Sequence, residues 1–221
     1  MEDELFPRAC ARIAPGAVHV PDWLDTDRQR ALLAACRDWA RPPAGLRTVR
    51  TPGGGTMTAR QVCLGWHWHP YAYARTVVDG DGSPVKPFPA WLDELGRRAV
   101  ADALGPAAVD GLSYDIALIN FYDADARMGM HRDADEKSQA PVVSLSLGDT
   151  CVFRFGNPES RGRPYTDVEL RSGDLFVFGG GSRLAYHGVP KVHPGTAPAE
   201  LGLTGRLNVT LRVSGFGGAL T

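Results

Sequence analysis

From residue 112 to the end of the sequence, apolar and polar residues tend to alternate, and this period of two constrains the fold more than any other feature. Successive side chains of a β-strand point to opposite faces, so the alternation predicts strands that bury one face. The predicted strands, most of them bounded by Gly, Pro or Asp turns, are 114–122, 142–147, 151–156, 166–170, 174–178, 184–187 and 206–213. Many short strands of this kind are typical of a double-sheet barrel.

The first third of the chain has helical rather than strand periodicity. A helix is predicted over 26–39, because the Pro42-Pro43 pair prevents its continuation, and a second over about 89–104, ahead of Gly105-Pro106. Residues 1–20 are predicted to be an irregular or short-strand lead-in. Helices followed by many strands indicate an α+β protein whose core is a jelly roll or a similar double-sheet barrel.

The length and composition indicate one globular domain. With 221 residues the chain can bury a sizeable core, so a single domain over 1–221 is predicted, with an N-terminal extension over about 1–110 and a β core over about 111–215. The four cysteines include no Cys-x-x-Cys pair, which argues against a disulfide framework or a thiolate zinc site. The sequence starts without signal-peptide features and has no apolar run of the ~20 residues that span a bilayer. A cytoplasmic protein without membrane contact is therefore expected.

The net charge of the chain argues against nucleic-acid binding that depends on an overall positive charge. The formal net charge is −1, whereas proteins that track along a duplex are typically basic. Arginines are nevertheless frequent in one part of the chain, namely Arg127, Arg132, Arg154, Arg161, Arg163, Arg171 and Arg183. They predict a local basic rim that contacts a few phosphates.

Two histidines and an aspartate form a candidate metal site. His131 and Asp133 are two residues apart, so on a strand or at its end their side chains lie on the same side. His187 comes from a different strand, and the glycine turn at 179–181 allows a return hairpin. Two imidazoles and one carboxylate leave coordination positions open, which is typical of non-haem Fe(II) oxygenases. Ordinary surface histidines are the alternative, because the chain has six histidines in all.

The predicted strand 206–213 supports the metal interpretation. One of its faces carries only polar side chains, those of Arg206, Asn208, Thr210 and Arg212. A surface strand alternates in the same way, so that alternative stays open. Beside a metal, however, two arginines fit a dicarboxylate co-substrate, which requires a forked partner at one end and a second cation at its chelating end. The set favours Fe(II), with zinc as the second choice.

Eight segments then match the pattern of one known family. They are Thr51-Pro-Gly-Gly-x-Thr-Met57, Leu64-Gly-Trp66, Leu118-Ile-Asn-x-Tyr122, His131-x-Asp-x-Asp-Glu136, Pro141-Val-Val-Ser-Leu-Ser-Leu-Gly148, Gly173-Asp174, Gly179-Gly-x-Ser-Arg-Leu-x-Tyr-His-Gly188 and Arg206-x-Asn-x-Thr-x-Arg212. The chain resembles the AlkB family of Fe(II)- and 2-oxoglutarate-dependent dioxygenases, in particular its bacterial alkylation-repair members. The segments run from about residue 50 to 212, and together they are highly specific.

The resemblance implies a role for each matching residue of the metal and co-substrate sites. His131, Asp133 and His187 would bind Fe(II). Arg206 would pair with the distal carboxylate of 2-oxoglutarate, with help from Tyr122 and Asn120. Asn208 and Arg212 would hold the end of 2-oxoglutarate that chelates the metal, and O2 would be the second co-substrate.

The resemblance also implies a nucleotide-recognition lid in the N-terminal part and a double-stranded β-helix (jelly-roll) core. Trp66, Tyr71 and Tyr73 would be the substrate-binding aromatics of this lid, Asp135 the catalytic-site carboxylate that reads the base, and Arg161 a further substrate contact. Methylation of adenine N1 or cytosine N3 leaves a cationic base, which an aromatic face and a carboxylate both prefer over the neutral base. The lesion also blocks pairing, so that flipping the base out costs less.

The function implied by the resemblance is oxidative dealkylation of bases such as 1-methyladenine and 3-methylcytosine, with release of formaldehyde, succinate and CO2. The expected partner of a monomeric enzyme is alkylated single- or double-stranded DNA, with RNA as a further substrate. Two alternatives from other classes are a 2-oxoglutarate-dependent hydroxylase of a protein or small metabolite and a non-catalytic nucleic-acid-binding sensor. The aromatic and carboxylate set argues against the first, and an assay for succinate separates the second.

Overall fold

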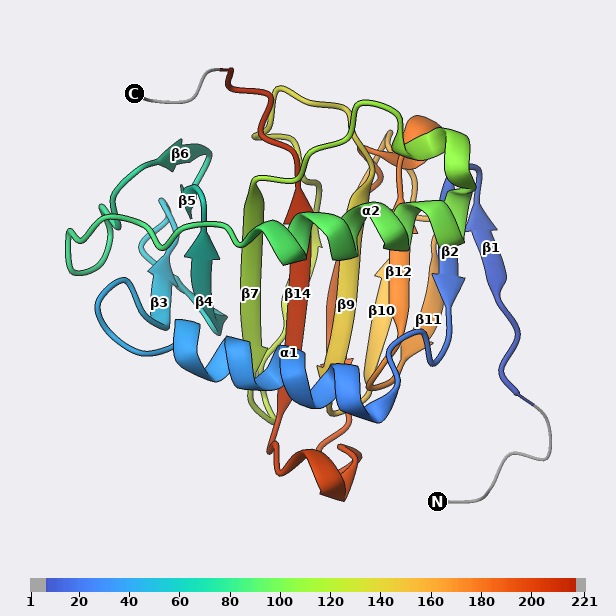
Figure 1. Ribbon diagram of the computed structural model, residues 1–221, viewed down its shortest axis with the longest axis horizontal. Helices are drawn as coiled ribbons and strands as arrows, with labels where there is room; N and C mark the ends of the chain where they lie inside the picture. Colours follow the sequence, from blue (N-terminus) through green and yellow to red (C-terminus); the bar gives the residue numbers. More distant parts are fainter. Residues whose placement is uncertain (1–6, 218–221) are drawn as a thin grey trace.

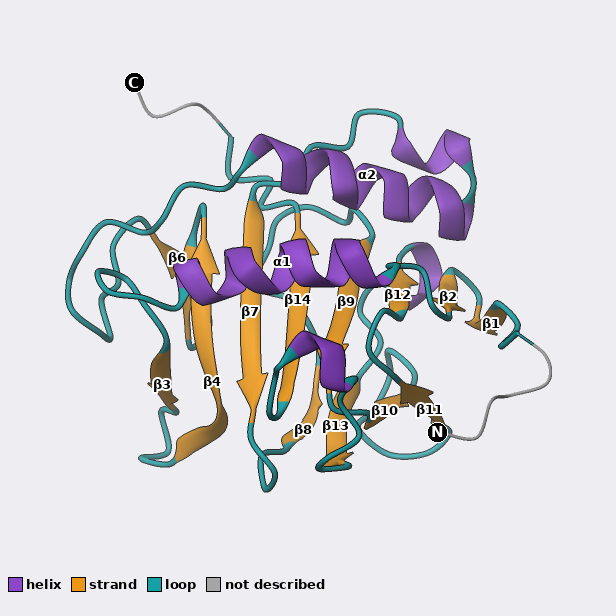
Figure 2. Ribbon diagram, turned by 60° about the horizontal axis from the view of Figure 1, so that its bottom comes forward, coloured by secondary structure: helices purple, strands orange, loops and turns teal. Residues whose placement is uncertain are grey.

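The computed structural model describes residues 7–217, and two facing β-sheets form its core (Figure 2). The larger sheet contains, in spatial order, β1 (Ala11–Ala14), β2 (Ala17–Val20), β12 (Leu175–Phe178), β9 (Val142–Gly148), β14 (Arg206–Arg212), β7 (Ile116–Tyr122), β4 (Thr56–Leu64) and β3 (Arg47–Arg50). The smaller sheet contains β11 (Thr166–Leu170), β10 (Cys151–Phe155), β13 (His187–Val192) and β8 (Met128–His131). This arrangement is the predicted jelly roll, and the strands pair antiparallel within both sheets.

Two helices cover the outer face of the larger sheet (Figure 1). They are α1 (Thr26–Trp39) and α2 (Ala90–Leu104), as the helical spacing predicts, and together with β1–β4 they make the protein α+β. The side chain of Asp25 caps α1 by accepting a hydrogen bond from the Arg28 amide. Helix α2 lies close to the sheet at Gly96, where an added Cβ would come within 2.7 Å of the Tyr114 ring. This side of the sheet holds the larger hydrophobic cluster of the protein.

A second hydrophobic cluster fills part of the space between the two sheets. Strand β10 alternates as the sequence indicates, with Cys151, Phe153 and Phe155 buried and the residues between them partly exposed. Phe176 and Phe178 of β12 face them from the larger sheet, at ring-centroid distances of 4.9 to 5.5 Å. Two of these rings, those of Phe153 and Phe178, border polar side chains in the space between the sheets.

Most predicted strands are confirmed, and one is wrong. Residues 184–187 were predicted as a strand, but residues 184–186 form a turn and an irregular segment after a short 3₁₀ helix (Gly180–Ser182), and β13 (His187–Val192) begins only at His187. The reason is tertiary, because Arg183 is buried and donates hydrogen bonds to Asp133, Glu136 and Ala140. Strands β3, β4 and β8 have no counterpart in the prediction, and the lead-in forms the hairpin β1–β2.

The remaining elements are short. A separate hairpin of β5 (His67–His69) and β6 (Ala72–Ala74) lies beside β3 and β4 (Figure 1). Two further 3₁₀ helices occupy Pro106–Val109 and Ala199–Leu201. Among the described residues, none of the helices is long and apolar enough to cross a membrane.

Candidate metal centre and its cavity

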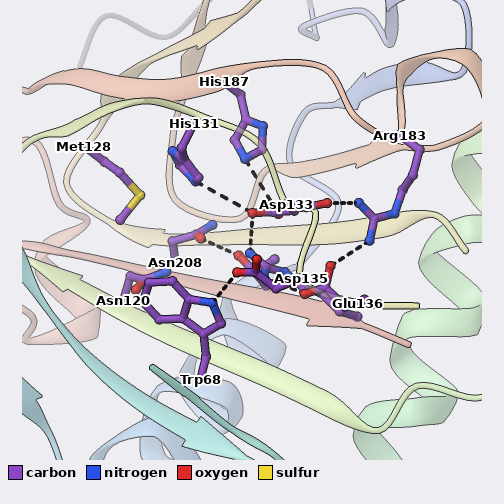
Figure 3. A network of polar contacts seen from close by, with 12 residues as sticks. Trp68, Asn120, Met128, His131, Asp133, Asp135, Glu136, Arg183, His187 and Asn208 are labelled. Carbon is purple, nitrogen blue, oxygen red and sulfur yellow. Dashed lines mark hydrogen bonds and ion pairs between the residues drawn. The ribbon is translucent and has the colours of Figure 1, made fainter. Parts of the chain in front are cut away.

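The two histidines and the aspartate come together at one end of the smaller sheet. His131 is the last residue of β8 and His187 the first of β13; they face each other in register with ring centroids 4.5 Å apart. The Asp133 carboxylate lies 3.7 Å from the Nε2 atom of each imidazole (Figure 3). One ligand atom from each of the three residues lies within 4.8 Å of the others. The prediction that these three side chains meet is confirmed.

Backbone hydrogen bonds orient both imidazoles toward the aspartate. Nδ1 of His131 lies 2.9 Å from the carbonyl oxygen of Gly129, and Nδ1 of His187 lies 3.0 Å from that of Ala185. Because a carbonyl oxygen only accepts, each Nδ1 carries the proton and each Nε2 keeps its lone pair for a metal. Burial and the neighbouring His131 ring lower the pKa of His187 to about 4, so its imidazole is neutral at neutral pH.

The Asp133 carboxylate is ionised and only partly satisfied. Burial by itself would raise its pKa, but Arg212 and the two imidazoles lower that pKa to about 2. Arg212 pairs with Oδ1 at 2.6 Å, whereas Oδ2 is buried without a hydrogen-bond partner. A buried carboxylate oxygen without a partner, beside two free imidazole lone pairs, fits a divalent cation. The donors include no thiolate and match Fe(II), with zinc second.

A cavity extends from these three residues into the space between the sheets. Besides the three residues, its lining comprises Asn120, Tyr122, Met128, Ser144, Phe153, Phe178, Gly188, Val189, Arg206, Asn208, Thr210 and Arg212. The polar face of β14 therefore points inward, and Arg206 is only 1% exposed. The alternative that this strand alternates because it lies on the surface is excluded.

Arg206 is a buried cation in the wall of this cavity. Its guanidinium donates to the Ser146 hydroxyl at 2.9 Å and weakly to the Asp149 carbonyl at 3.4 Å, while its Nε has no partner. Among the described residues, no carboxylate lies within salt-bridge distance of it. Since a buried charge is stable only when it is paired, this guanidinium fits an anionic ligand in the cavity.

The neighbouring strand adds neutral polar groups to the same wall. In the antiparallel pairing of β14 with β7, Arg206 lies opposite Tyr122 and Asn208 lies opposite Asn120. The Asn208 amide donates to the Ser144 hydroxyl at 2.7 Å, and the Asn120 carbonyl accepts from Gln61 at 3.1 Å. Burial raises the pKa of Tyr122, so its hydroxyl keeps its proton as a donor. All predicted co-substrate residues thus line one cavity.

A buried charge network that the sequence did not reveal lies behind the metal site. Glu136 accepts a hydrogen bond from Arg183 at 3.0 Å and one from Arg212 at 2.9 Å, and the Tyr73 hydroxyl also donates to it. Arg183 additionally donates to the backbone carbonyl of Asp133 at 2.6 Å. Two arginines and two carboxylates therefore fix the loop that carries the metal ligand. The only signal in the sequence was the position of Glu136 in the His131-x-Asp-x-Asp-Glu136 segment.

The predicted substrate aromatics lie in different surroundings. Trp66 does not line the cavity: the Arg75 guanidinium lies 3.4 Å above its ring, and its indole donates to Asp115 at 3.2 Å. Tyr71, at the tip of the β5–β6 hairpin, is 77% exposed. Tyr73 is turned inward, with its hydroxyl on Glu136. The tryptophan that reaches the metal loop is Trp68, whose Nε1 donates to Oδ2 of Asp135 at 2.8 Å (Figure 3).

Arg161 lies with other cationic side chains on the outer surface beside the metal ligands. Tyr186, which precedes His187, has the Arg132 and Arg161 guanidiniums at 5.3 and 5.8 Å from its ring centroid. Both arginines are exposed, and none of the salt bridges among the described residues involves either of them. The local basic rim therefore has uncompensated charge next to the metal site.

The chain is similar to known iron- and 2-oxoglutarate-dependent oxygenases. A family model described as the 2OG-Fe(II) oxygenase superfamily matches residues 16–212. The chain is 36% identical to an alpha-ketoglutarate-dependent dioxygenase AlkB homolog of Caulobacter vibrioides, over 90% of this chain and 88% of that protein. It is also 36% identical to the alpha-ketoglutarate-dependent dioxygenase AlkB of Escherichia coli, over 76% of this chain and 77% of the relative.

Similarity also extends to longer eukaryotic proteins. The chain is 33% identical to the DNA N(6)-methyladenine demethylase ALKBH1D of Arabidopsis thaliana over 90% of this chain. It spans only about half the length of that protein and of a second Arabidopsis relative, at 50% and 49%. The solved structure of OsALKBH1 superposes with a TM-score of 0.83 at 31% identity, covering 92% of this chain and 99% of that one.

Proposed function

Because the chain belongs to the AlkB family within the 2OG-Fe(II) oxygenase superfamily, we propose that it removes N-linked alkyl groups from nucleobases of nucleic acids by oxidation. The observation that carries the proposal is the shared cavity. A three-ligand metal site and an unpaired buried guanidinium, that of Arg206, open into the same space. The E. coli and Caulobacter relatives are named as alpha-ketoglutarate-dependent dioxygenases, and a fission-yeast relative as a tRNA demethylase.

In this proposal the cavity residues that hold the metal and those that hold 2-oxoglutarate are different. His131, Asp133 and His187 hold Fe(II). Together with 2-oxoglutarate and O2, the iron supplies oxidation of the alkyl carbon, so that formaldehyde, succinate and CO2 are released. Arg206 pairs with the distal carboxylate of 2-oxoglutarate, and the Tyr122 hydroxyl and the Asn120 amide, which lie on the paired strand, donate to the same end.

The other end of the co-substrate is assigned to Asn208 and Arg212. Arg212 already pairs with Asp133 at 2.6 Å and with Glu136 at 2.9 Å, so its position is fixed relative to the metal ligand. A guanidinium held in this way presents a cation near the chelating carboxylate without a change of rotamer. Asn208 is oriented by its bonds to Ser144 and Thr210.

The substrate base is assigned to the half-exposed Asp135, two residues after the metal ligand. A carboxylate at this place favours a cationic base such as 1-methyladenine or 3-methylcytosine and accepts a hydrogen bond from its exocyclic amino group. Tyr71 and Arg161 are assigned to the flanking strand, because both are exposed and one carries uncompensated charge. Trp66 and Tyr73 were expected to contact the base, but their contacts with Arg75 and Glu136 support roles within the lid.

The proposal also includes the domain organisation, the localisation and the oligomeric state of the protein. We treat 1–221 as one domain, because β1–β4, which precede residue 110, complete the same sheet as the core strands. The proposed enzyme is a cytoplasmic monomer that acts on single- or double-stranded DNA, and on RNA as a further substrate.

The test is incubation with Fe(II), 2-oxoglutarate and an oligonucleotide that contains one 1-methyladenine. Formaldehyde release and a loss of 14 Da from the base, followed in parallel for DNA and RNA of the same sequence, are the expected results. Succinate without any change in the base would favour a hydroxylase of a protein or small metabolite. Absence of succinate in every arm would favour a non-catalytic sensor.

A further inference from the structure

Asn120 presents a side-chain amide to the co-substrate cavity, and the orientation of that amide decides what it can bind. The side chain is 6% exposed and lines the cavity from β7. Its nitrogen end donates hydrogen bonds, whereas its oxygen end only accepts them, so only the nitrogen end can hold a carboxylate. A half-turn of the amide exchanges the two ends. Another group therefore has to fix which end faces the ligand.

Gln61 binds the oxygen end of this amide. It lies on β4, directly opposite Asn120 in the antiparallel pairing with β7, and is only 2% exposed. Its Nε2 donates to Oδ1 of Asn120 at 3.1 Å. No group in residues 7–217 accepts a hydrogen bond from Nδ2 of Asn120, so this nitrogen is left for a ligand in the cavity.

The orientation of Gln61 is in turn fixed by a cation. Both terminal nitrogens of the Arg47 guanidinium lie 3.5 Å from Oε1 of Gln61, and the Cys63 thiol donates to the same oxygen at 3.5 Å. A turned amide would place its NH2 group against the guanidinium, which has no acceptor. The oxygen of Gln61 therefore faces Arg47, and its nitrogen faces Asn120.

Arg47 is held in this place by two shorter contacts. Its Nε pairs with Asp79 at 2.9 Å, its Nη2 donates to the Trp68 carbonyl at 2.5 Å, and the side chain is only 9% exposed. A guanidinium that is buried and paired keeps its charge and its geometry without a ligand. The hydrogen-bond donors therefore point in one direction from Arg47 through Gln61 to Asn120, whose own donor points into the cavity.

We propose that Gln61 is a positioning residue for 2-oxoglutarate, because it holds the Asn120 amide with its nitrogen toward the cavity. Asn120 then donates to a carboxylate of the co-substrate. This inference rests on the proposed function, which assigns Asn120 to 2-oxoglutarate, and it names the residue that sets the direction of that hydrogen bond. Gln61 does not line the cavity, so its effect reaches the ligand through Asn120. A donor that is oriented in advance binds more tightly, because no reorientation precedes binding.

Two substitutions of Gln61 that differ in what they offer Asn120 test the inference. Gln61→Met removes the amide, so both orientations of Asn120 become available and the dissociation constant of 2-oxoglutarate is expected to rise about twofold. Gln61→Glu introduces a carboxylate that pairs with Arg47 and can only accept. Asn120 then turns its nitrogen toward position 61 and its oxygen toward the ligand. The dissociation constant is expected to rise roughly tenfold to a hundredfold.

Isothermal titration calorimetry of 2-oxoglutarate into the full chain loaded with Mn²⁺ measures this affinity without turnover. Gln61→Glu is studied alone and together with Asn120→Ala. Its loss of affinity is expected to vanish in the Asn120→Ala background, because the two residues act as one unit. A loss that persists in that background would indicate direct repulsion by the added charge. Equal affinities of Gln61→Met and Gln61→Glu would indicate a purely structural role. Either result would overturn the proposal.

Gln29→Glu is the matched control. Gln29 is also buried, donates through Nε2 to the Leu24 carbonyl at 2.8 Å and accepts from the Ser172 hydroxyl at 2.7 Å, but it lies on α1 and does not line the cavity. The same substitution is expected to lower the melting temperature and to leave the affinity for 2-oxoglutarate unchanged. An equal fall in affinity in Gln29→Glu and Gln61→Glu would trace the effect to general destabilisation and refute the role of Gln61.

Dealkylation assays on the same variants separate this inference from the proposed function. Gln61→Glu is expected to raise the KM for 2-oxoglutarate and to leave kcat nearly unchanged. If the wild type binds 2-oxoglutarate with the expected order of affinities but repairs no 1-methyladenine, the dealkylation proposal fails while the role of Gln61 stands. If the wild type repairs the lesion and Gln61→Glu binds 2-oxoglutarate as the wild type does, dealkylation stands and the role of Gln61 is refuted.

Discussion

Replacement of Arg206 by methionine tests the co-substrate site with two effects of opposite sign. The side chain is 1% exposed and has no carboxylate partner among the described residues, so the protein without 2-oxoglutarate buries an uncompensated charge. Arg206→Met fills a similar volume and removes that charge. The free energy of unfolding without 2-oxoglutarate is therefore expected to stay equal or to rise.

The affinity for 2-oxoglutarate is expected to fall steeply in the same variant. The distal carboxylate would be buried without its partner, which costs roughly 3–5 kcal/mol. At about 1.4 kcal/mol for each factor of ten, the dissociation constant rises about a hundredfold or more. At a concentration of 100 times the wild-type constant, 2-oxoglutarate stabilises the wild type by about 2.7 kcal/mol and the variant by about 0.4 kcal/mol.

Thermal unfolding with Mn²⁺ and with or without 2-oxoglutarate measures both effects. For a chain of this size the ligand should raise the melting temperature of the wild type by roughly 5–10 °C and that of the variant by roughly 1–2 °C. The matched control is Arg183→Met, because Arg183 is equally buried but paired with Glu136 at 3.0 Å. That variant should be less stable without ligand. An unchanged ligand shift in Arg206→Met would refute the role of Arg206.

The remaining predictions concern other charged groups. Asp133→Ala should lose bound iron and formaldehyde release, and near-wild-type turnover with added iron would contradict the metal assignment. Asp135→Ala should lose roughly tenfold to a hundredfold in kcat/KM on cationic lesions but less on 1-methylguanine; equal losses would indicate a structural role. Arg161→Ala should lower the slope of log affinity against log salt for single-stranded DNA by about 0.7, whereas Arg30→Ala on α1 leaves it unchanged. Asp174 is buried, and although burial would raise its pKa, hydrogen bonds from His19 and Arg8 lower it to about 2, below the ordinary 3.8. The ionised carboxylate contributes about 2 kcal/mol to the free energy of unfolding above pH 4, and this contribution is lost as the pH falls toward 2. The free energy of unfolding in urea should therefore depend less on pH in that range for Asp174→Asn than for the wild type.

The sequence by itself was sufficient wherever structure follows from local periodicity. Both helices and most of the core strands were predictable, because apolar residues recur with the spacing of the element that buries them, but β8 and β13 were not. The metal ligands were predictable from His131-x-Asp133, since side chains two apart share one side of a strand, and from the family segments around His187. The alternation in β14 predicted its polar face in the same way. It did not predict whether that face points to solvent or into the protein.

Only the tertiary structure decided which polar groups meet. Whether Arg206 faces water or the cavity depends on which side of the sheet is covered by helices and which by the smaller sheet. The ion pair of Arg183 with Glu136 was not predictable in the same way, and residues 184–186 beside it do not form the predicted strand, because partners 47 residues apart leave no local pattern. Trp66 and Trp68 look alike in the sequence. In the structure the Trp66 ring lies under the Arg75 guanidinium, whereas the Trp68 indole donates to Asp135, because long-range contacts determine where each side chain points.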